Sequence, residues 1–160
     1  MKRFITITLI ISFIAFFVYG CSKKHGTNSV VKLKSDGRFV VLIFDSTSCP
    51  YCKKLKNDLN NNPELSKLSK KMVIYTIHVN EEGTYILPTK KGNLKVSSQN
   101  LARMYGFRGS TPYIVFCNSD FRPIVTIPGY LKPETLVRVF KYVLTRAYKT
   151  MSINEYLSTP

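Results

Sequence analysis

Short apolar runs alternate along the chain with lysine-rich amphipathic stretches, and their order predicts an α/β protein. Residues 39–44 and 73–79 are rich in β-branched and aromatic side chains, which is typical of buried strands. Between them, residues 53–59 and 63–70 predict two helices, the second of which begins at a proline. A strand, a helical stretch and a second strand in that order imply a parallel pair with a right-handed crossover.

The second half of the chain predicts a helix, a hairpin and a last helix. The helix runs from residue 97 or 98 to 105, strands follow at 113–117 and 124–127, and apolar residues recur at helical spacing after Pro133. The link between the two strands is short, which favours an antiparallel hairpin.

Residues 80–96 separate the two halves of the chain. They are polar and predict an exposed loop, with a short ribbon around residues 85–87 and 94–96. The complete order β-α-β-α-β-β-α predicts a central mixed β-sheet flanked by helices on both faces.

The N-terminus has the pattern of a secretory signal. Lys2 and Arg3 precede an apolar stretch of about 15 residues, which is short of the roughly 20 that span a bilayer as a helix, so a retained transmembrane anchor is the weaker alternative. Residues 18–21 resemble the bacterial lipobox, although Tyr19 is bulkier than usual there. That resemblance implies a lipid on Cys21 of an exported protein facing the periplasm or the cell exterior. The alternative is an ordinary cleavage site with an incidental cysteine.

Composition then divides the chain into three parts. We expect residues 1–20 to be a lipoprotein-type signal peptide, residues 21–35 a flexible polar tether, and residues 36–160 one folded domain that is monomeric.

The chain is strongly basic, with a formal net charge of +15. Loss of residues 1–20 removes Lys2 and Arg3 and leaves +13 on 140 residues. We interpret this charge as a solvated cationic surface; the alternatives are attraction to anionic lipid headgroups or to an acidic partner protein. The charges are spread along the chain and form no nucleic-acid-binding motif, which argues against nucleic acid as a partner.

The candidate chemistry lies in Cys49-Pro50-Tyr51-Cys52, between the polar turn 45–48 and a predicted helix. At a helix N-terminus, backbone N–H groups and the helix dipole stabilise a thiolate, so Cys49 is predicted to be the attacking sulfur. Cys52 lies one turn further along the same face and is predicted to resolve the mixed disulfide. Pro50 and Tyr51 are expected to shape the surface that meets the substrate.

This order of elements, with Cys-x-x-Cys at the first strand-to-helix turn and Thr111-Pro112 before the hairpin, resembles the thioredoxin fold. The resemblance implies that residues 36–160 form a thioredoxin-like domain. It also implies a cis bond before Pro112, and that Thr111 and Pro112 lie against the cysteines and contact substrate. A trans, purely structural proline is the alternative.

Within that fold, residues 49–54, 109–112 and 128–130 resemble exported thioredoxin-like proteins of the SoxW-like type. Two positions depart from cytosolic thioredoxins. Ser48 replaces the tryptophan before the first cysteine, and Ile43 replaces the buried aspartate that helps deprotonate the resolving cysteine. Asp45 falls at another position, in the predicted turn, so the role is not transferred to it. We therefore expect Cys52 to rely on water or on the neighbouring Lys53 and Lys54.

Other reactive residues receive ordinary roles. Cys117 is predicted to be a small buried core residue, with a regulatory thiol as the alternative. His78 is interpreted as a partly covered strand residue rather than a catalytic base. One Cys-x-x-Cys and two histidines, His25 and His78, are too few for a typical zinc site, and we expect no metal.

We therefore predict a membrane-anchored thiol–disulfide oxidoreductase that needs no cofactor besides the Cys49–Cys52 dithiol. The resemblance implies a reductase of protein or small-molecule disulfides, supplied with electrons by a membrane thiol donor. A disulfide oxidase or isomerase is the near alternative. A carrier of copper or another soft metal on the same cysteines, or a redox-silent adaptor, are alternatives from other classes.

Overall fold

The computed structural model describes residues 30–159. At its centre four strands form a mixed sheet in the order β3-β2-β6-β7. β2 is parallel to β3, with Val40 opposite Val73, and antiparallel to β6, with Val40 opposite Cys117. These strands are β2 (Val40–Asp45), β3 (Val73–His78), β6 (Tyr113–Cys117) and β7 (Pro123–Pro128). The predicted parallel pair and the predicted antiparallel hairpin of β6 and β7 are both confirmed.

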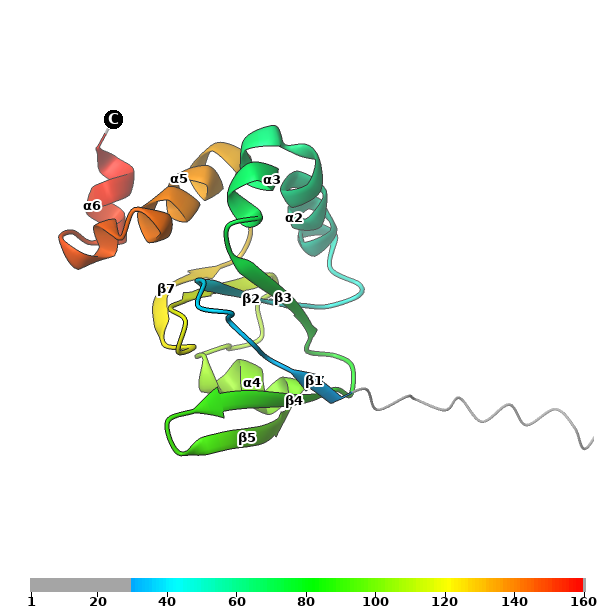
Figure 1. Cartoon of the computed structure of the whole chain (residues 1–160). Helices are drawn as coiled ribbons and strands as arrows, with labels where there is room; N and C mark the ends of the chain where they lie inside the picture. The colour runs from blue at the N-terminus through cyan, green and yellow to red at the C-terminus, as the bar shows by residue number, and fades with distance from the viewer. Residues whose placement is uncertain (1–29, 160) are drawn as a thin grey trace, which may run out of the picture.

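Helices cover both faces of this sheet, which confirms the predicted fold class. Figure 1 shows α2, α3 and α5 above the sheet and α4 beneath it. Alternate residues of β2 serve the two sides: Val41 and Ile43 belong to the core under α2, α3 and α5, whereas Leu42 and Phe44 belong to the core on the α4 side. The helices are α2 (Pro50–Asn61), α3 (Pro63–Ser69), α4 (Ser98–Met104) and α5 (Pro133–Leu144).

Local sequence explains where these helices begin. Proline occupies the first turn of α2, α3 and α5, where no backbone N–H is needed. The side chain of Asn62 accepts hydrogen bonds from two N–H groups of α3, and Ser97 accepts one from Asn100 of α4. The first helix begins at Pro50, three residues before the predicted start, so Cys49 caps it and Cys52 lies in its first turn.

The short ribbon predicted around residues 85–87 and 94–96 is confirmed, because these residues pair antiparallel, but the prediction of a loop for the rest of residues 80–96 is wrong. β4 (Thr84–Thr89) and β5 (Gly92–Ser97) form an antiparallel hairpin, and β1 (Val30–Lys32) adds to it in parallel. The predicted domain start at residue 36 is also too late, because β1 is paired and Leu33 is only 1% exposed. The hydrogen bonds between β1 and β4 order this segment. The Leu33 N–H adds one more by donating to the Ile86 carbonyl.

A short C-terminal helix, α6 (Ile153–Ser158), follows the 3-10 turn η1 (Ala147–Lys149) and was not predicted. It rests against α5, whose Arg138 guanidinium donates to the backbone carbonyls of Tyr156 and Leu157 at 2.6 and 3.0 Å, and also to that of Thr159. These are carbonyls that a helix end leaves without partners, so Arg138 caps α6 from another helix.

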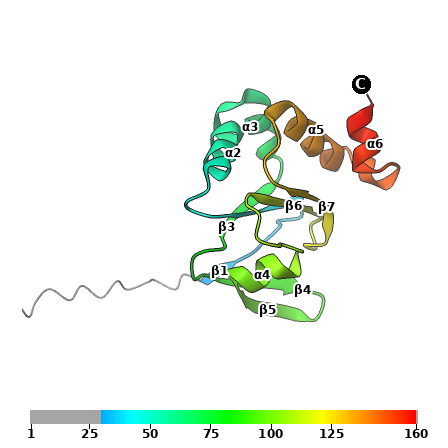
Figure 2. The same cartoon turned by 180° about the vertical axis from the view of Figure 1, so that it is seen from behind.

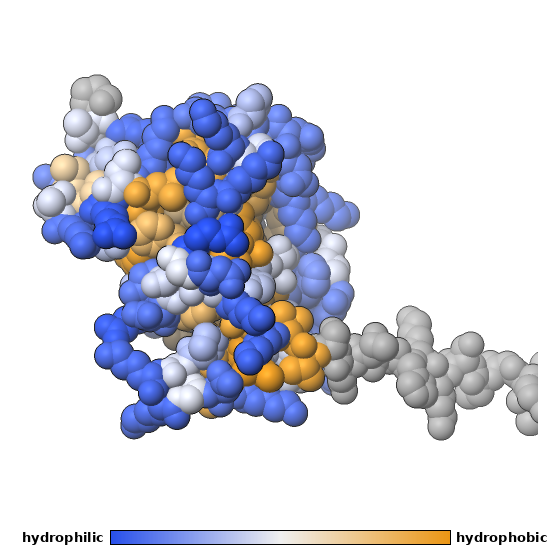
Figure 3. All heavy atoms as spheres, viewed as in Figure 1, coloured by the Kyte–Doolittle hydropathy of each residue, from blue (hydrophilic) through white to orange (hydrophobic). Residues whose placement is uncertain are grey.

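The chain enters the folded part at β1. Both cartoon views place the start of β1 on the same side of the molecule as the turn between β2 and α2 (Figure 1 and Figure 2). Hydrophilic side chains cover most of the face drawn in Figure 3, but apolar ones gather beside β1, where Val30 is 52% exposed. Among residues 30–159, no helix has the length and apolar character needed to cross a membrane. The predicted signal peptide and Cys21 lie outside the described residues.

Candidate active site

The two cysteines lie where β2 gives way to α2, at the carboxyl edge of the central sheet. Cys49 is the N-cap of α2, as predicted, and its sulfur accepts a hydrogen bond of 3.1 Å from the Cys52 N–H. The two residues are joined by a disulfide, with their Cα atoms 5.3 Å apart. Cys52 is only 3% exposed, whereas Cys49 is half-buried. An attacking group must be reached from outside, so the geometry suits Cys49 to attack and Cys52 to resolve.

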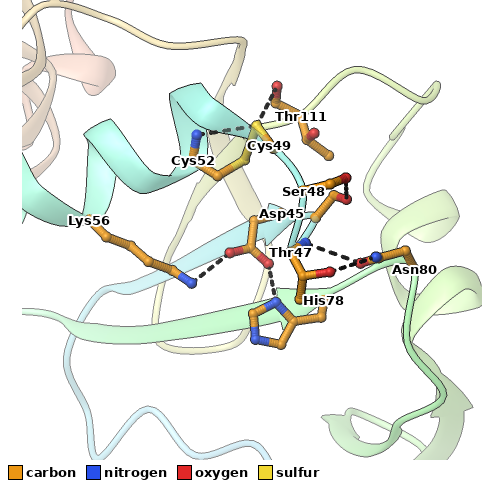
Figure 4. The surroundings of a disulfide bond; sticks show 10 residues. Asp45, Thr47, Ser48, Cys49, Cys52, Lys56, His78, Asn80 and Thr111 are labelled. Atoms are coloured by element: carbon orange, nitrogen blue, oxygen red, sulfur yellow. Dashed lines mark hydrogen bonds and ion pairs between the residues drawn. A yellow bond between two sulfur atoms is a disulfide. The ribbon is translucent and has the colours of Figure 1, made fainter.

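The loop before β6 lies directly against Cys49. The Thr111–Pro112 bond is cis, as the resemblance implied, and Pro112 is buried. The Cys49 sulfur lies 3.4 Å from the Thr111 carbonyl oxygen (Figure 4), to which a reduced thiol can donate. The Gly129 N–H donates to the Pro112 carbonyl at 2.8 Å, which fastens this loop to the end of β7. The structure thus brings together Cys49, Cys52, Thr111 and Pro112.

Beside the cysteines two tyrosines form an aromatic surface. Tyr51 is 60% exposed and stacks on Tyr130, with ring centroids 5.8 Å apart. The Lys54 ammonium lies 4.9 Å from the centre of the Tyr130 ring, and the Tyr130 hydroxyl donates to Asp58 at 2.7 Å. Burial, followed by this hydrogen bond to Asp58, raises the pKa of Tyr130 to about 12, so the phenol stays neutral. Through its stacking on Tyr51, Tyr130 lies at the rim of the site.

Behind the disulfide lies a buried carboxylate. Asp45 is the last residue of β2 rather than part of a turn, and is 1% exposed. Its partners are the Lys56 ammonium at 2.9 Å and the His78 imidazole at 2.5 Å, in the geometry of ion pairs rather than aligned hydrogen bonds. Figure 4 shows Asp45 between the disulfide and the His78 ring. Because residues 43 and 45 share one face of the strand, Asp45 lies one pleat beyond Ile43.

This finding corrects one expectation: Asp45 belongs to β2 and is buried, instead of lying in a turn. A buried acid does lie behind the cysteines, on Asp45, although the position occupied by Ile43 lacks one. Lys54, which with water and Lys53 was expected to assist Cys52, lies over the Tyr130 ring. The sequence contained a signal that could have revealed Asp45. It is a charged residue two positions after Ile43, on the same strand face, and the following helix carries a lysine, Lys56.

Cys117 lies away from this chemistry. Cys117 is 0% exposed within β6, as predicted, and burial raises the pKa of its thiol to about 12 despite an opposing hydrogen bond with Tyr105. Within residues 30–159, no three His, Cys, Asp or Glu side chains gather in a way that could hold a metal ion. His25 lies outside the described residues.

Comparisons with known proteins agree with this architecture. The sequence matches the family model of the thioredoxin-like domain over residues 27–144. A thioredoxin-fold protein from Helicobacter pylori superposes with a TM-score of 0.68 at 24% identity, over 79% of this chain and 81% of that chain. A thioredoxin from Thermus thermophilus superposes with a TM-score of 0.51 at 23% identity, over 69% of this chain and 77% of that one. No curated protein matches the sequence.

The two solved structures share the fold, and the family model covers most of the chain, including the cysteine pair, the Thr-Pro loop and most of α5. Fold and cysteine pair together support a thiol–disulfide redox function. The chain belongs to the family of thioredoxin-like domains.

Proposed function

We propose that this chain is an exported, lipid-anchored thiol–disulfide oxidoreductase of the SoxW-like type that reduces disulfides of protein or small-molecule substrates. One observation carries the proposal: an accessible sulfur at a helix N-terminus is bonded to a buried one and lies 3.4 Å from the Thr111 carbonyl oxygen. This arrangement holds an attacking group, a resolving group and a substrate-facing backbone edge together. The lipid on Cys21 and the reductive direction rest on the sequence patterns alone.

The proposed reaction exchanges electrons between thiols and disulfides only. In the reduced protein the Cys49 thiolate attacks one sulfur of a substrate disulfide, forming a mixed disulfide and releasing the first substrate thiolate. Cys52 then gives up its proton and attacks the Cys49 sulfur, which releases the second substrate thiolate and forms the Cys49–Cys52 disulfide. Two electrons pass to the substrate, and a membrane thiol donor returns them by the same exchange.

The surroundings of the pair favour each step. The Cys52 N–H and the positive end of α2 stabilise the Cys49 thiolate. Pro112 has no N–H, which leaves the neighbouring backbone free to pair with an extended substrate, while Pro50 and Tyr51 present the adjoining surface. Asp45 lies behind the disulfide and is the available acceptor for the Cys52 proton.

The mixed disulfide provides the first test. A Cys52→Ala variant cannot resolve it, so incubation with oxidised insulin should give a covalent adduct that dithiothreitol reverses. The matched control is the Cys49→Ala, Cys52→Ala double variant, which keeps Cys117 and should form none. Equal amounts of insulin adduct on both variants would contradict the assignment of Cys49 as the attacking residue. Metal bound in proportion to the protein and lost in Cys49→Ser, without insulin reduction, would favour the soft-metal carrier.

The direction of electron flow is tested by the equilibrium potential of the Cys49–Cys52 couple against glutathione. Thioredoxins lie near about −270 mV and the strongest oxidants of this fold near about −120 mV. We expect a value toward the reducing end. A value near the oxidising end would make the protein an oxidase or isomerase.

A further inference from the structure

A cavity lies beside the loop that leads into Thr111. It encloses about 430 Å³, within the range of small binding sites, and is lined by Val79, Gln99, Arg103, Phe107, Arg108 and Gly109. Arg103 comes from α4, and Arg108 belongs to the loop that leads into Thr111. Neither guanidinium forms an ion pair with any residue between positions 30 and 159.

Two connections place this cavity next to the reactive sulfur. On one side, Gly109 is two residues from Thr111, whose carbonyl oxygen lies 3.4 Å from the Cys49 sulfur. Two residues of chain reach at most about 7 Å. On the other side, the Val79 N–H donates to the Asp45 carbonyl at 2.9 Å, and the neighbouring Asn80 donates to the Thr47 hydroxyl at 2.9 Å (Figure 4). Both walls are thus tied to the turn that carries Cys49.

The cavity is lined by an aromatic ring that packs against the core and by two arginines. The Phe107 ring packs edge-on against Tyr113, with centroids 5.8 Å apart, and also contacts Phe44 of the core. No carboxylate lines the cavity; Glu81 and Glu82 line a separate hollow beyond Gln99. Guanidinium groups match carboxylates through paired N–H donors, more closely than they match other common side chains.

We propose that this cavity is a subsite for an acidic side chain of a protein substrate, located two or three residues from the cysteine that Cys49 attacks. The spacing follows from the reach of an extended chain laid along the Thr111 edge. This inference deepens the proposed reductase function and rests on it: it names the substrates as proteins with Asp or Glu close to the reactive disulfide.

The test compares two disulfide-bonded peptides that differ only in having Glu or Gln two and three residues from the attacked cysteine. The reduced full-length protein is mixed with each peptide, and the rate constant for peptide reduction is measured in single turnover. We expect the Glu peptide to react about five- to tenfold faster at low ionic strength, with a preference that shrinks in salt. Arg103→Gln with Arg108→Gln should bring the ratio close to one.

Arg122→Gln is the matched control, because Arg122 is an exposed arginine outside this cavity, and it should keep the wild-type ratio. A ratio near one in the wild type, or an unchanged ratio in the double variant, overturns the subsite.

A second measurement separates this inference from the proposed function. Cysteine-free Glu and Gln peptides are titrated into the oxidised protein while amide chemical shifts are recorded. Selective shifts at Arg108 and Gly109 with the Glu peptide support the subsite, whether or not the disulfide peptides are reduced. Failure to reduce either disulfide peptide would contradict the reductase proposal but not the subsite. Equal shifts with both peptides overturn the subsite.

Discussion

Asp45 is a carboxylate with 1% of its side chain exposed, and the Lys56 ammonium and the His78 imidazole face it. A buried charge left without its partner is costly, whereas removal of the charge itself is tolerated when the partners can reach water. Lys56 is 45% exposed and His78 is 35% exposed, so both can be solvated. The cost of substitution should therefore depend strongly on which member of the cluster is changed.

We accordingly expect Lys56→Gln to lower the free energy of unfolding by about 1–2 kcal/mol. The Asp45→Asn, Lys56→Gln double variant should recover most of that loss, because no buried charge remains. Denaturant unfolding of the four members of this cycle measures the effect. Lys53→Gln, an exposed lysine of the same helix without an ion pair in the described part of the chain, should change little. Similar losses in the single and double variants would contradict the argument.

Cys117 gives a prediction for alkaline pH. Burial raises the pKa of its thiol from 9.0 to about 12 and also raises the pKa of Tyr105. Above pH 9 the unfolded chain releases the Cys117 proton while the folded chain keeps it, so stability is full below pH 9 and falls as pH rises. The fall is at most about 1.4 kcal/mol per pH unit for each group.

Urea unfolding between pH 8 and 10.5 measures this slope. The background should be Cys49→Ser, Cys52→Ser, which prevents disulfide exchange in the unfolded chain. Adding Cys117→Ala should make the slope shallower while leaving the contribution of Tyr105. An unchanged slope would show that the thiol is not protected by burial.

At the scale of elements, the chain was predictable where side chains repeat with the period of a buried strand or helix. The four central strands, α3, α4 and α5 lie within one or two residues of their predicted positions. Only residues 94–96 of β5 were predicted, because nearly all its residues are exposed, which removes any apolar alternation. β1 has three residues, and its pairing with β4, more than fifty positions later, orders it.

In the cysteine site, too, the residues in local motifs were predictable and those brought together by distant pairing were not. Cys49, Cys52 and the Thr-Pro loop form local sequence motifs, so the sequence was sufficient to identify them as candidate site residues. Asp45, Lys56 and His78 come from a strand, a helix and a neighbouring strand, and their meeting depends on the parallel register of β2 and β3, in which Asp45 lies opposite His78. Sequence spacing alone does not reveal that encounter.

Arg138 offers a test of how α6 is held. Its guanidinium donates to carbonyls at the C-terminal end of that helix. Hydrogen bonds to charged groups contribute about 1.5–3 kcal/mol, so Arg138→Gln should speed amide exchange in residues 153–158 by about tenfold or more. Lys141→Gln is the control from the same helix, since it removes only an exposed pair with Glu64. Equal exchange in both variants would mean that apolar packing alone holds α6.

At the scale of the whole molecule, the β1-β4-β5 sheet and the central sheet share one core. Leu33 and Leu87 belong to the same buried cluster as Leu42 and Phe44 of β2. The segment near residue 33 should therefore unfold together with the rest of the protein, although its sequence has the polar composition of a tether.

Leu33→Ala tests this union. Loss of a buried leucine costs about 2–5 kcal/mol, and we expect a value in that range with a single transition by circular dichroism and tyrosine fluorescence. Leu94→Ala, at a leucine that is 41% exposed on β5, should change the free energy of unfolding by less than about 0.5 kcal/mol. A small effect of Leu33→Ala, or two separate transitions, would show that the smaller sheet folds independently.

The start of β1, on the same side of the molecule as the turn before α2, bears on where catalysis occurs. If Cys21 carries the proposed lipid, residues 21–29 bridge the bilayer surface and Val30, a contour of about 30 Å at full extension. Turnover would then be confined to a thin layer beside the membrane. The proposed membrane thiol donor would meet the protein by lateral diffusion in two dimensions, while bulky substrates in the open compartment would have to approach the bilayer to be reduced.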